Sequence, residues 1–150
     1  MEHPKAIGDR TTLAVMAALQ RLGYGLYMPL GENTRCDLIM ESRGELVRIQ
    51  CKTGRLRKGA VAFSLCSNYG HHRNPETRHR PYQGQIDFFA VYCPETNGVY
   101  LVPITDVPGS RQARLRVDPP RNQQRKRIRF AARYEIARVT TEGLRASSGA

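Results

Sequence analysis

Alternation of side-chain character over Glu45–Thr53 constrains the fold of this chain more than any other feature of its sequence. Successive side chains of an extended strand point to opposite faces, so this stretch has one apolar and one mainly polar face. The apolar face is Val47, Ile49 and Cys51, and the other is Leu46, Arg48, Gln50 and Lys52. Because a turn-forming Ser42-Arg43-Gly44 and an apolar Cys36–Glu41 precede it, we predict an antiparallel hairpin.

A helix is predicted between Gly8 and Leu22, where apolar residues recur at helical spacing in two adjoining stripes. Two stripes favour a helix that is largely buried. Asp9 stands where an N-cap or a first-turn acid is expected, and Gly23 suits a left-handed C-terminal stop.

The remaining elements are mostly strands. They are predicted over Tyr24–Met28, Ala60–Leu65, Gln85–Cys93 and Val99–Ile104, with weak helical character over Phe130–Val139. Gln85–Cys93 is almost continuously apolar, as expected for a central strand buried on both faces. The polar stretch Ser67–Gly84 predicts an ordered loop that touches a ligand. This order of elements predicts an α/β (α+β) domain with a central mixed β-sheet.

The charge of the chain points to a polyanionic partner. Its 150 residues contain 24 Lys and Arg against 13 Asp and Glu, a net charge of +11. Residues 111–150 hold most of the excess, with 11 basic and 3 acidic side chains. Arg outnumbers Lys 20 to 4, and the planar guanidinium suits phosphate oxygens. A solvated basic tail is the alternative, but apolar residues interleaved with the arginines favour a docked segment.

Length and composition favour one domain over 1–150, with an Arg-rich segment 111–133 and a frayed tail 140–150. No apolar run is long enough to span a membrane, and the first ten residues lack the apolar core of a signal peptide. We therefore expect no membrane partner and a cytoplasmic protein, with association with the nucleoid as a further option.

Three polar side chains converge on the predicted hairpin. Asp37 opens one arm, and Gln50 and Lys52 project from the same face of the other. Asp37 and the Gln50 oxygen, with the backbone carbonyl of Cys51, can ligate a hard divalent cation. Lys52 can position the attacking water and offset charge that develops on a phosphate. The alternative is a hairpin whose exposed face is merely polar, with Lys52 in solvent, and spacing alone does not separate the two.

A longer pattern surrounds these residues. The stretch PLGENTRCDLIMESRGELVRIQCKTGRLRKGAVAF (29–63) resembles the PD-(D/E)XK nuclease superfamily, in the branch of group I intron-encoded (homing) endonucleases. That branch is recognised by a GEN-x-R-x-DL strand followed by an R-[IV]-Q-x-KTGR strand. The likeness continues through CSNYGHHR (66–73), RPYQGQIDFFAVYCPETNGVYLVP (80–103) and PPRNQQRKRIRFAARYEI (119–136).

The resemblance implies a restriction-endonuclease-like core, in which helices flank the central mixed sheet. It implies that Asp37 is the motif aspartate, that Gln50 occupies the Asp/Glu position and that Lys52 is the motif lysine. The activity implied is that of an Mg²⁺-dependent endodeoxyribonuclease acting on duplex DNA, with Mn²⁺ as a substitute cofactor.

One position departs from the branch. Its first helix typically reads G-D-x-x-E-L, whereas Thr12 stands here where that Glu would be. Asp9, on the neighbouring helical surface, is a partial substitute for the missing carboxylate. The departure keeps open the alternative of a nucleic-acid-binding protein of the same fold with weakened catalysis. A junction or repair nuclease is a further alternative, because nucleases of this kind share one site across many substrates.

Basic side chains in three regions are the expected contacts to the DNA backbone. They are Arg55, Arg57, Lys58, His71, His72, Arg73, Arg121, Arg125, Lys126 and Arg127. Because one small site must cut both strands, we also expect a homodimer or a homotetramer.

Overall fold

The computed structural model describes residues 2–31, 34–68, 79–109, 111–120, 122 and 125–136. Among these residues, no helix is long and apolar enough to cross a membrane. The helices and strands, in chain order, are α1 (Pro4–Arg21), β1 (Gly25–Tyr27), β2 (Leu38–Ser42), β3 (Glu45–Thr53), β4 (Arg55–Arg57), β5 (Ala60–Ser64), β6 (Cys66–Asn68), β7 (His79–Pro81), β8 (Phe88–Cys93), β9 (Gly98–Pro103), the 3₁₀ turn η1 (Ile104–Asp106), β10 (Gln112–Arg116) and α3 (Ala131–Tyr134).

Helix α1 begins four residues earlier than the apolar pattern predicts. His3 caps it, since its side chain accepts a hydrogen bond from the Lys5 N–H at 3.2 Å, and Pro4 at the first helical position needs no partner for its nitrogen. The prediction of Asp9 as N-cap or first-turn acid is therefore wrong, because Asp9 lies inside the helix and is exposed. Gly23 has φ +87° and is confirmed as the left-handed stop.

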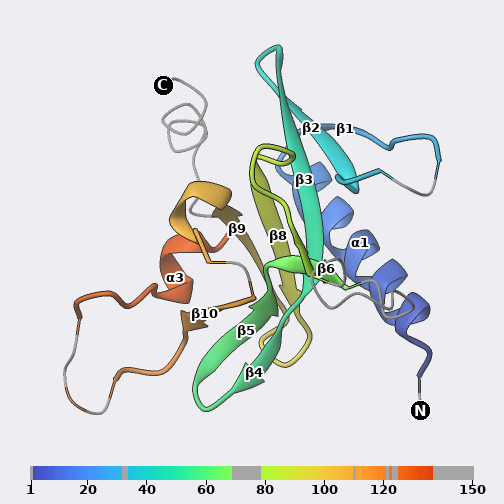
Figure 1. Ribbon diagram of the computed structural model, residues 1–150. Helices are drawn as coiled ribbons and strands as arrows, with labels where there is room; N and C mark the ends of the chain where they lie inside the picture. The colour runs from blue at the N-terminus through green and yellow to red at the C-terminus, as the bar shows by residue number, and fades with distance from the viewer. Residues whose placement is uncertain are drawn as a thin grey trace.

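Only one stripe of α1 is buried, and the prediction of a largely buried helix is wrong. Thr11, Val15 and Leu19 face the sheet, whereas Leu13 of the second stripe is 64% exposed. The helix packs on a single sheet face, so its outer side meets solvent (Figure 1).

A five-stranded sheet of order β1-β2-β3-β8-β9 forms the centre of the molecule. β3 and β8 are parallel, and the other neighbours are antiparallel. The prediction of a central mixed sheet is confirmed. So is the position of β8 inside it, with Phe89 and Val91 packed into one core cluster and Phe88 and Ala90 into another.

The β2–β3 hairpin has the predicted turn. Ser42 pairs with Glu45, which leaves Arg43 and Gly44 as a two-residue loop with φ of 53° and 81°. Two consecutive positive φ values match the right-handed twist of the strands, and the register they set is Leu38 opposite Ile49. β2 begins at Leu38, two residues later than predicted, and this leaves Asp37 just outside the strand.

A second sheet of order β10-β5-β4 packs on the other side of the central sheet. β4 is not predicted by the sequence pattern. β10 lies within the Arg-rich segment, and its Ala113 and Leu115 are buried, which confirms that this part of the segment is docked. α3 has only four residues, fewer than the predicted helix, of which residues 137–139 lie outside the described part of the chain.

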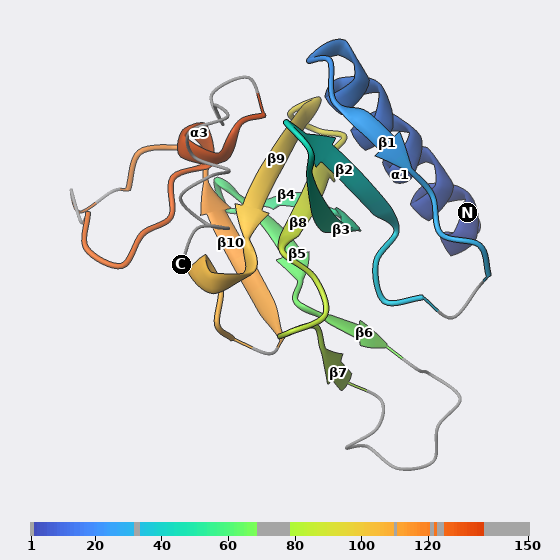
Figure 2. The same ribbon diagram turned by 90° about the horizontal axis from the view of Figure 1, so that it is seen from above.

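The layers follow in order: α1, the five-stranded sheet, then the second sheet with α3 (Figure 2). The small pair β6–β7 extends from the end of β5. The α1 side of the central sheet and the second-sheet side have separate core clusters. The site residues lie where the second sheet and β6 meet β3, near the start of β2.

Candidate active site

Asp37 sits at the edge of β3, immediately before β2. Its N–H donates to the Ile49 carbonyl at 2.8 Å, and its Oδ2 accepts the Cys51 N–H at 2.9 Å. In an antiparallel ladder the N–H and C=O of a residue point to the same side, so the Cys51 carbonyl faces the same edge. Burial raises the pKa of Asp37, while the Cys51 N–H and the charge of Lys52 oppose this shift.

Gln50 reaches the backbone of the same residue, Cys51, at its carbonyl. Its Nε2 lies 3.5 Å from the Cys51 carbonyl oxygen, a long and weak contact. A half-turn of the side-chain amide exchanges the positions of its nitrogen and its oxygen. In that orientation the Gln50 oxygen lies beside the Cys51 carbonyl and can serve as a ligand for a cation. Asp37 thus contacts the N–H of Cys51 and Gln50 lies beside its carbonyl, so both side chains reach the backbone of this residue.

Lys52 is half-buried, and the alternative that places it in solvent is wrong. Its Nζ donates to the Cys66 carbonyl at 3.0 Å and to the Tyr82 hydroxyl at 3.3 Å. It also lies 4.9 Å from the centroid of the Tyr82 ring. Burial lowers the pKa of Lys52, the Asp37 charge acts against this, and the Arg35 charge adds to it.

Arg35 and Tyr82 are site residues that sequence reasoning missed. The Arg35 guanidinium stacks 4.0 Å from the Tyr82 ring centroid and donates to the Gln85 side-chain oxygen and to the Ser67 hydroxyl. Tyr82 is 3% exposed, and its ring packs edge-on against Phe89. Arg35 stands inside the GEN-x-R-x-DL stretch, so a signal was present, but no spacing rule connects it to Tyr82.

Thr12 lies on the α1 side of the site strand. Its hydroxyl donates to the Gly8 carbonyl at 3.1 Å and is within hydrogen-bonding reach of the Cys51 thiol. Burial raises the pKa of that thiol, and the charge of Asp37 raises it further. Position 12 therefore contacts the residue whose backbone Asp37 and Gln50 share, whereas Asp9 is exposed one turn earlier.

The donor set fits a hard divalent cation. Within the described ranges, no three His, Cys, Asp or Glu side chains gather into a metal-binding group. A cation here would rest on one carboxylate, one amide oxygen and one backbone carbonyl. Oxygen-only ligands of this kind suit Mg²⁺, which keeps several of its own waters.

The expected DNA contacts fall into two groups outside this cluster. Arg57 and Lys58 are exposed at the β4–β5 turn, while Arg55 is half-buried with its Nη1 3.9 Å from the Glu95 carboxylate. The second group is exposed before α3: Arg125, Lys126 and Arg127. Four further predicted contacts lie outside the described residues: His71, His72, Arg73 and Arg121.

A central mixed sheet with an aspartate at one strand end and a Gln-x-Lys pair on the next strand defines a restriction-endonuclease-like protein. The model of the PD-(D/E)XK endonuclease family matches residues 2–137, and the chain belongs to this family of nucleases. A bacterial homing endonuclease, I-Ssp6803I, has a similar structure, with a TM-score of 0.68 and 22% sequence identity over 100% of both chains. At this identity the likeness establishes the fold. No curated protein matches the chain in a sequence comparison.

Proposed function

We propose that the protein is an Mg²⁺-dependent endodeoxyribonuclease that hydrolyses phosphodiester bonds of duplex DNA, in the manner of homing endonucleases. The observation that carries this proposal is the meeting of Asp37 and Gln50 at the backbone of Cys51, with the Lys52 ammonium one residue further along β3. Membership of the PD-(D/E)XK endonuclease family supports the reaction class, and the likeness in fold to a bacterial homing endonuclease supports the choice of substrate.

Asp37, Gln50 and the Cys51 carbonyl would hold the cation. When bound, it supplies positive charge that acidifies water and stabilises the phosphoryl oxygens. Lys52 orients the attacking water and offsets the negative charge that grows on the phosphate. A P–O bond forms to the water oxygen, and the P–O bond to the leaving sugar oxygen breaks.

Tyr82 and the Cys66 carbonyl hold Lys52 in position, and Arg35 packs on the ring of Tyr82. The Tyr82 hydroxyl and the Cys66 carbonyl fix two of the three ammonium donors, and the third donor has no hydrogen-bond acceptor among the described residues and can reach water or phosphate. The ring of Tyr82 lies under both cations, and such contacts are stabilising when they are removed from solvent.

The second candidate is a DNA-binding protein of the same fold with weakened catalysis. The neutral side chains of Thr12 and Gln50 favour it, because neither adds a second negative charge beside Asp37, and no metal-binding group of His, Cys, Asp and Glu side chains is found among the described residues. A junction or repair nuclease would use the same residues on branched DNA.

One assay separates these candidates. Random duplex, branched and single-stranded DNA are incubated with the protein in Mg²⁺, in Mn²⁺ or in EDTA. We expect nicking or cutting of duplex DNA that EDTA abolishes. Preferential cutting of branched DNA would identify the junction nuclease, and tight binding with no cleavage in either metal would overturn the enzymatic proposal.

Cleavage of both strands further leads us to propose a homodimer or a homotetramer. Light scattering after size exclusion, with and without duplex DNA, measures the mass directly. A monomeric mass in both conditions would contradict this assembly.

A further inference from the structure

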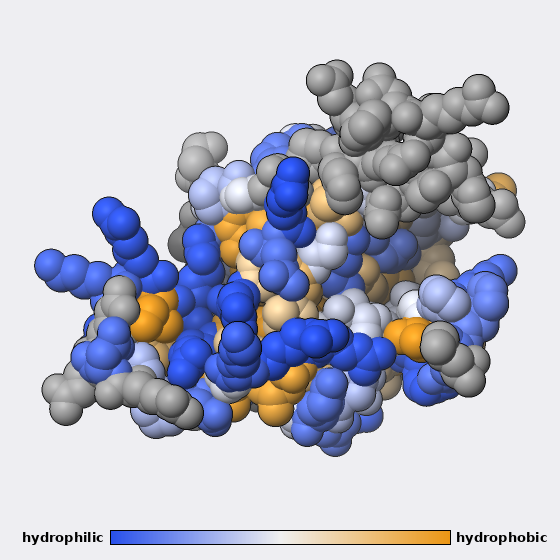
Figure 3. Space-filling view, turned by 60° about the horizontal axis from the view of Figure 1, so that its bottom comes forward, coloured by the Kyte–Doolittle hydropathy of each residue, from blue (hydrophilic) through white to orange (hydrophobic). Residues whose placement is uncertain are grey.

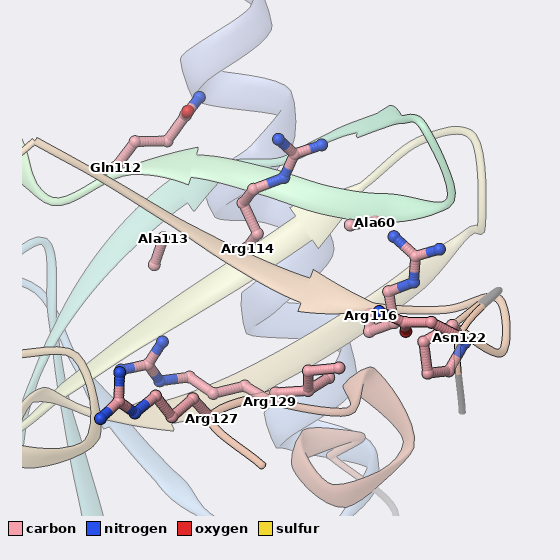
Figure 4. Close-up of a pocket in the computed structure, with 10 residues that line it drawn as sticks. Ala60, Gln112, Ala113, Arg114, Arg116, Asn122, Arg127 and Arg129 are labelled. Carbon is pink, nitrogen blue, oxygen red and sulfur yellow. The ribbon is translucent and has the colours of Figure 1, made fainter. Parts of the chain in front are cut away.

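A pocket of about 620 Å³ lies beside the second sheet, away from the candidate active site. Four arginines line it, two from the outer face of β10 and two from the segment that runs along the free edge of β10 (Figure 4). They are Arg114, Arg116, Arg127 and Arg129. Among the described residues that line the pocket, none carries a carboxylate. We call this site the arginine pocket.

Backbone carbonyls hold three of these arginines in place. Arg114 donates to the Arg57 carbonyl at 3.1 Å, and Arg116 to the Lys58 carbonyl at 3.2 Å. Arg129 donates to the carbonyl of Asp106 at 2.7 Å. These acceptors are neutral, so they orient the guanidinium groups without cancelling their charge. Arg116 also donates from Nε to the Asp118 carbonyl at 2.9 Å. Each guanidinium has five N–H donors, and the contacts among the described residues use one in Arg114, one in Arg129 and two in Arg116.

Small residues on β5 make this arrangement possible. Arg116 pairs across the sheet with Ala60, and Arg114 pairs with Ala62. Because alanine side chains are short, both arginines can cross β5 to reach the Arg57 carbonyl at the end of β4 and the Lys58 carbonyl in the β4–β5 turn. The surface of β5 therefore stays low beside the arginine side chains.

The other two arginines approach from the side. Arg127 has φ +62°, is exposed, and extends in the same direction as Arg129 in Figure 4. The N–H of Arg116 donates to the Arg129 carbonyl, which attaches this segment to β10 at 2.6 Å. Four like charges around one pocket repel one another, and a bound polyanion relieves that repulsion.

The surface around the β4–β5 turn suits an extended, hydrated ligand. Seen from below the view of Figure 1, hydrophilic side chains dominate it, and apolar residues show only in separate patches (Figure 3). β5 connects this region to the active site: Ala60 lines the pocket, and Cys66, just past the end of β5, accepts the hydrogen bond from Lys52. At about 3.3 Å per residue, the six residues between these two points span at most about 20 Å.

We propose that the arginine pocket binds backbone phosphates of duplex DNA to one side of the scissile bond. The inference rests on the proposed function for the identity of the substrate, and it adds a second anchor to it. An arginine can bind phosphate oxygens through two parallel hydrogen bonds, so the four guanidinium groups of the pocket suit a phosphate backbone.

The test uses a double variant, Arg114→Gln with Arg127→Gln, and a matched control, Lys5→Gln with Arg21→Gln. Both remove two positive charges, and the control pair is exposed on α1, on the far side of the central sheet. Affinity for a random 30-base-pair duplex is measured by fluorescence anisotropy in EDTA over a range of salt concentrations. Thermal unfolding of both variants verifies that they are folded.

We expect the pocket variant to bind at least about tenfold more weakly and to lower the slope of log K against log salt by about 2, one unit per lost phosphate contact. The control should leave that slope unchanged. An unchanged slope in the pocket variant, or an equal loss in the control, overturns the proposal. So does a loss of affinity for duplex RNA with none for duplex DNA.

This readout is independent of cleavage. A protein that binds DNA through the pocket but never cuts it leaves the pocket proposal standing and removes the nuclease. If the protein cuts DNA and the pocket variant binds DNA normally, the nuclease proposal stands and the pocket proposal falls.

Discussion

Replacement of Lys52 by Met separates the chemistry of the site from its structure. Lys52→Met keeps the aliphatic stem and removes the ammonium, with its hydrogen bonds to the Cys66 carbonyl and the Tyr82 hydroxyl. A charge-assisted hydrogen bond contributes about 1.5–3 kcal/mol to stability. Partial burial of the charge costs several kcal/mol, and methionine avoids that cost. The Ser64 hydroxyl still donates to the Cys66 carbonyl at 2.9 Å, so this carbonyl keeps a partner.

These opposing contributions leave a small effect on folding. We expect the free energy of unfolding to change by about 1 kcal/mol or less, which corresponds to about 2–4 °C in Tm for a chain of this size. The cleavage rate should fall by about 10²–10³, because a group that stabilises charge developing in the transition state typically contributes that much.

Two measurements check this prediction: single-turnover conversion of supercoiled plasmid in Mg²⁺, and urea unfolding in EDTA. Lys5→Met is the control, since Lys5 is exposed in the first turn of α1. A Lys52→Met protein that cuts within about threefold of the wild-type rate refutes the role of Lys52. A loss of cleavage matched by a loss of several kcal/mol in unfolding free energy refutes the separation of chemistry from structure.

Three further substitutions probe the surroundings of the site. Thr12→Glu should lower the Tm in EDTA by a few degrees, because it brings a second carboxylate toward Asp37. Mg²⁺ should then raise the Tm of this variant more than it raises the Tm of the wild type. An equal rise would show that position 12 lies outside the metal site. Tyr82→Phe keeps the ring and removes the hydroxyl that accepts from Lys52, so we expect cleavage about tenfold slower than that of the wild type, with a Tm within a few degrees of the wild-type value. An unchanged rate would exclude a role of Tyr82 in positioning Lys52. Gly54→Ala should destabilise the fold by about 1–3 kcal/mol in urea unfolding. The alanine Cβ would lie 2.6 Å from a methyl group of Val61 on β5 and 2.8 Å from one of Val91 on β8. Wild-type stability of this variant would contradict the close packing at the end of β3.

Local pattern was sufficient to predict the hairpin at the centre of the site. Period-two alternation fixes which face of β3 carries Gln50 and Lys52, and the turn residues fix the register that brings Asp37 to Cys51. The apolar continuity of β8 likewise predicts its central place in the sheet.

Contacts between segments distant in sequence could not be predicted in this way. Tyr82, which directly follows β7, meets Lys52 across 30 residues of sequence. β4 gains its strand character from pairing with β5. The start of α1 was misplaced for a different reason. Apolar periodicity marks where a helix is buried, whereas His3 and the following proline set where it begins.

The rate of duplex DNA cleavage as a function of Mg²⁺ concentration, for the wild type and for Asp37→Asn side by side, tests the central claim most directly. Asparagine retains the size of the side chain and removes the negative charge. We predict saturable, Mg²⁺-dependent cleavage by the wild type and a loss of at least about 10²-fold in the variant, with weaker Mg²⁺ dependence. Equal cleavage by both proteins, or cleavage by the wild type that persists in EDTA, would contradict a metal-dependent site at Asp37.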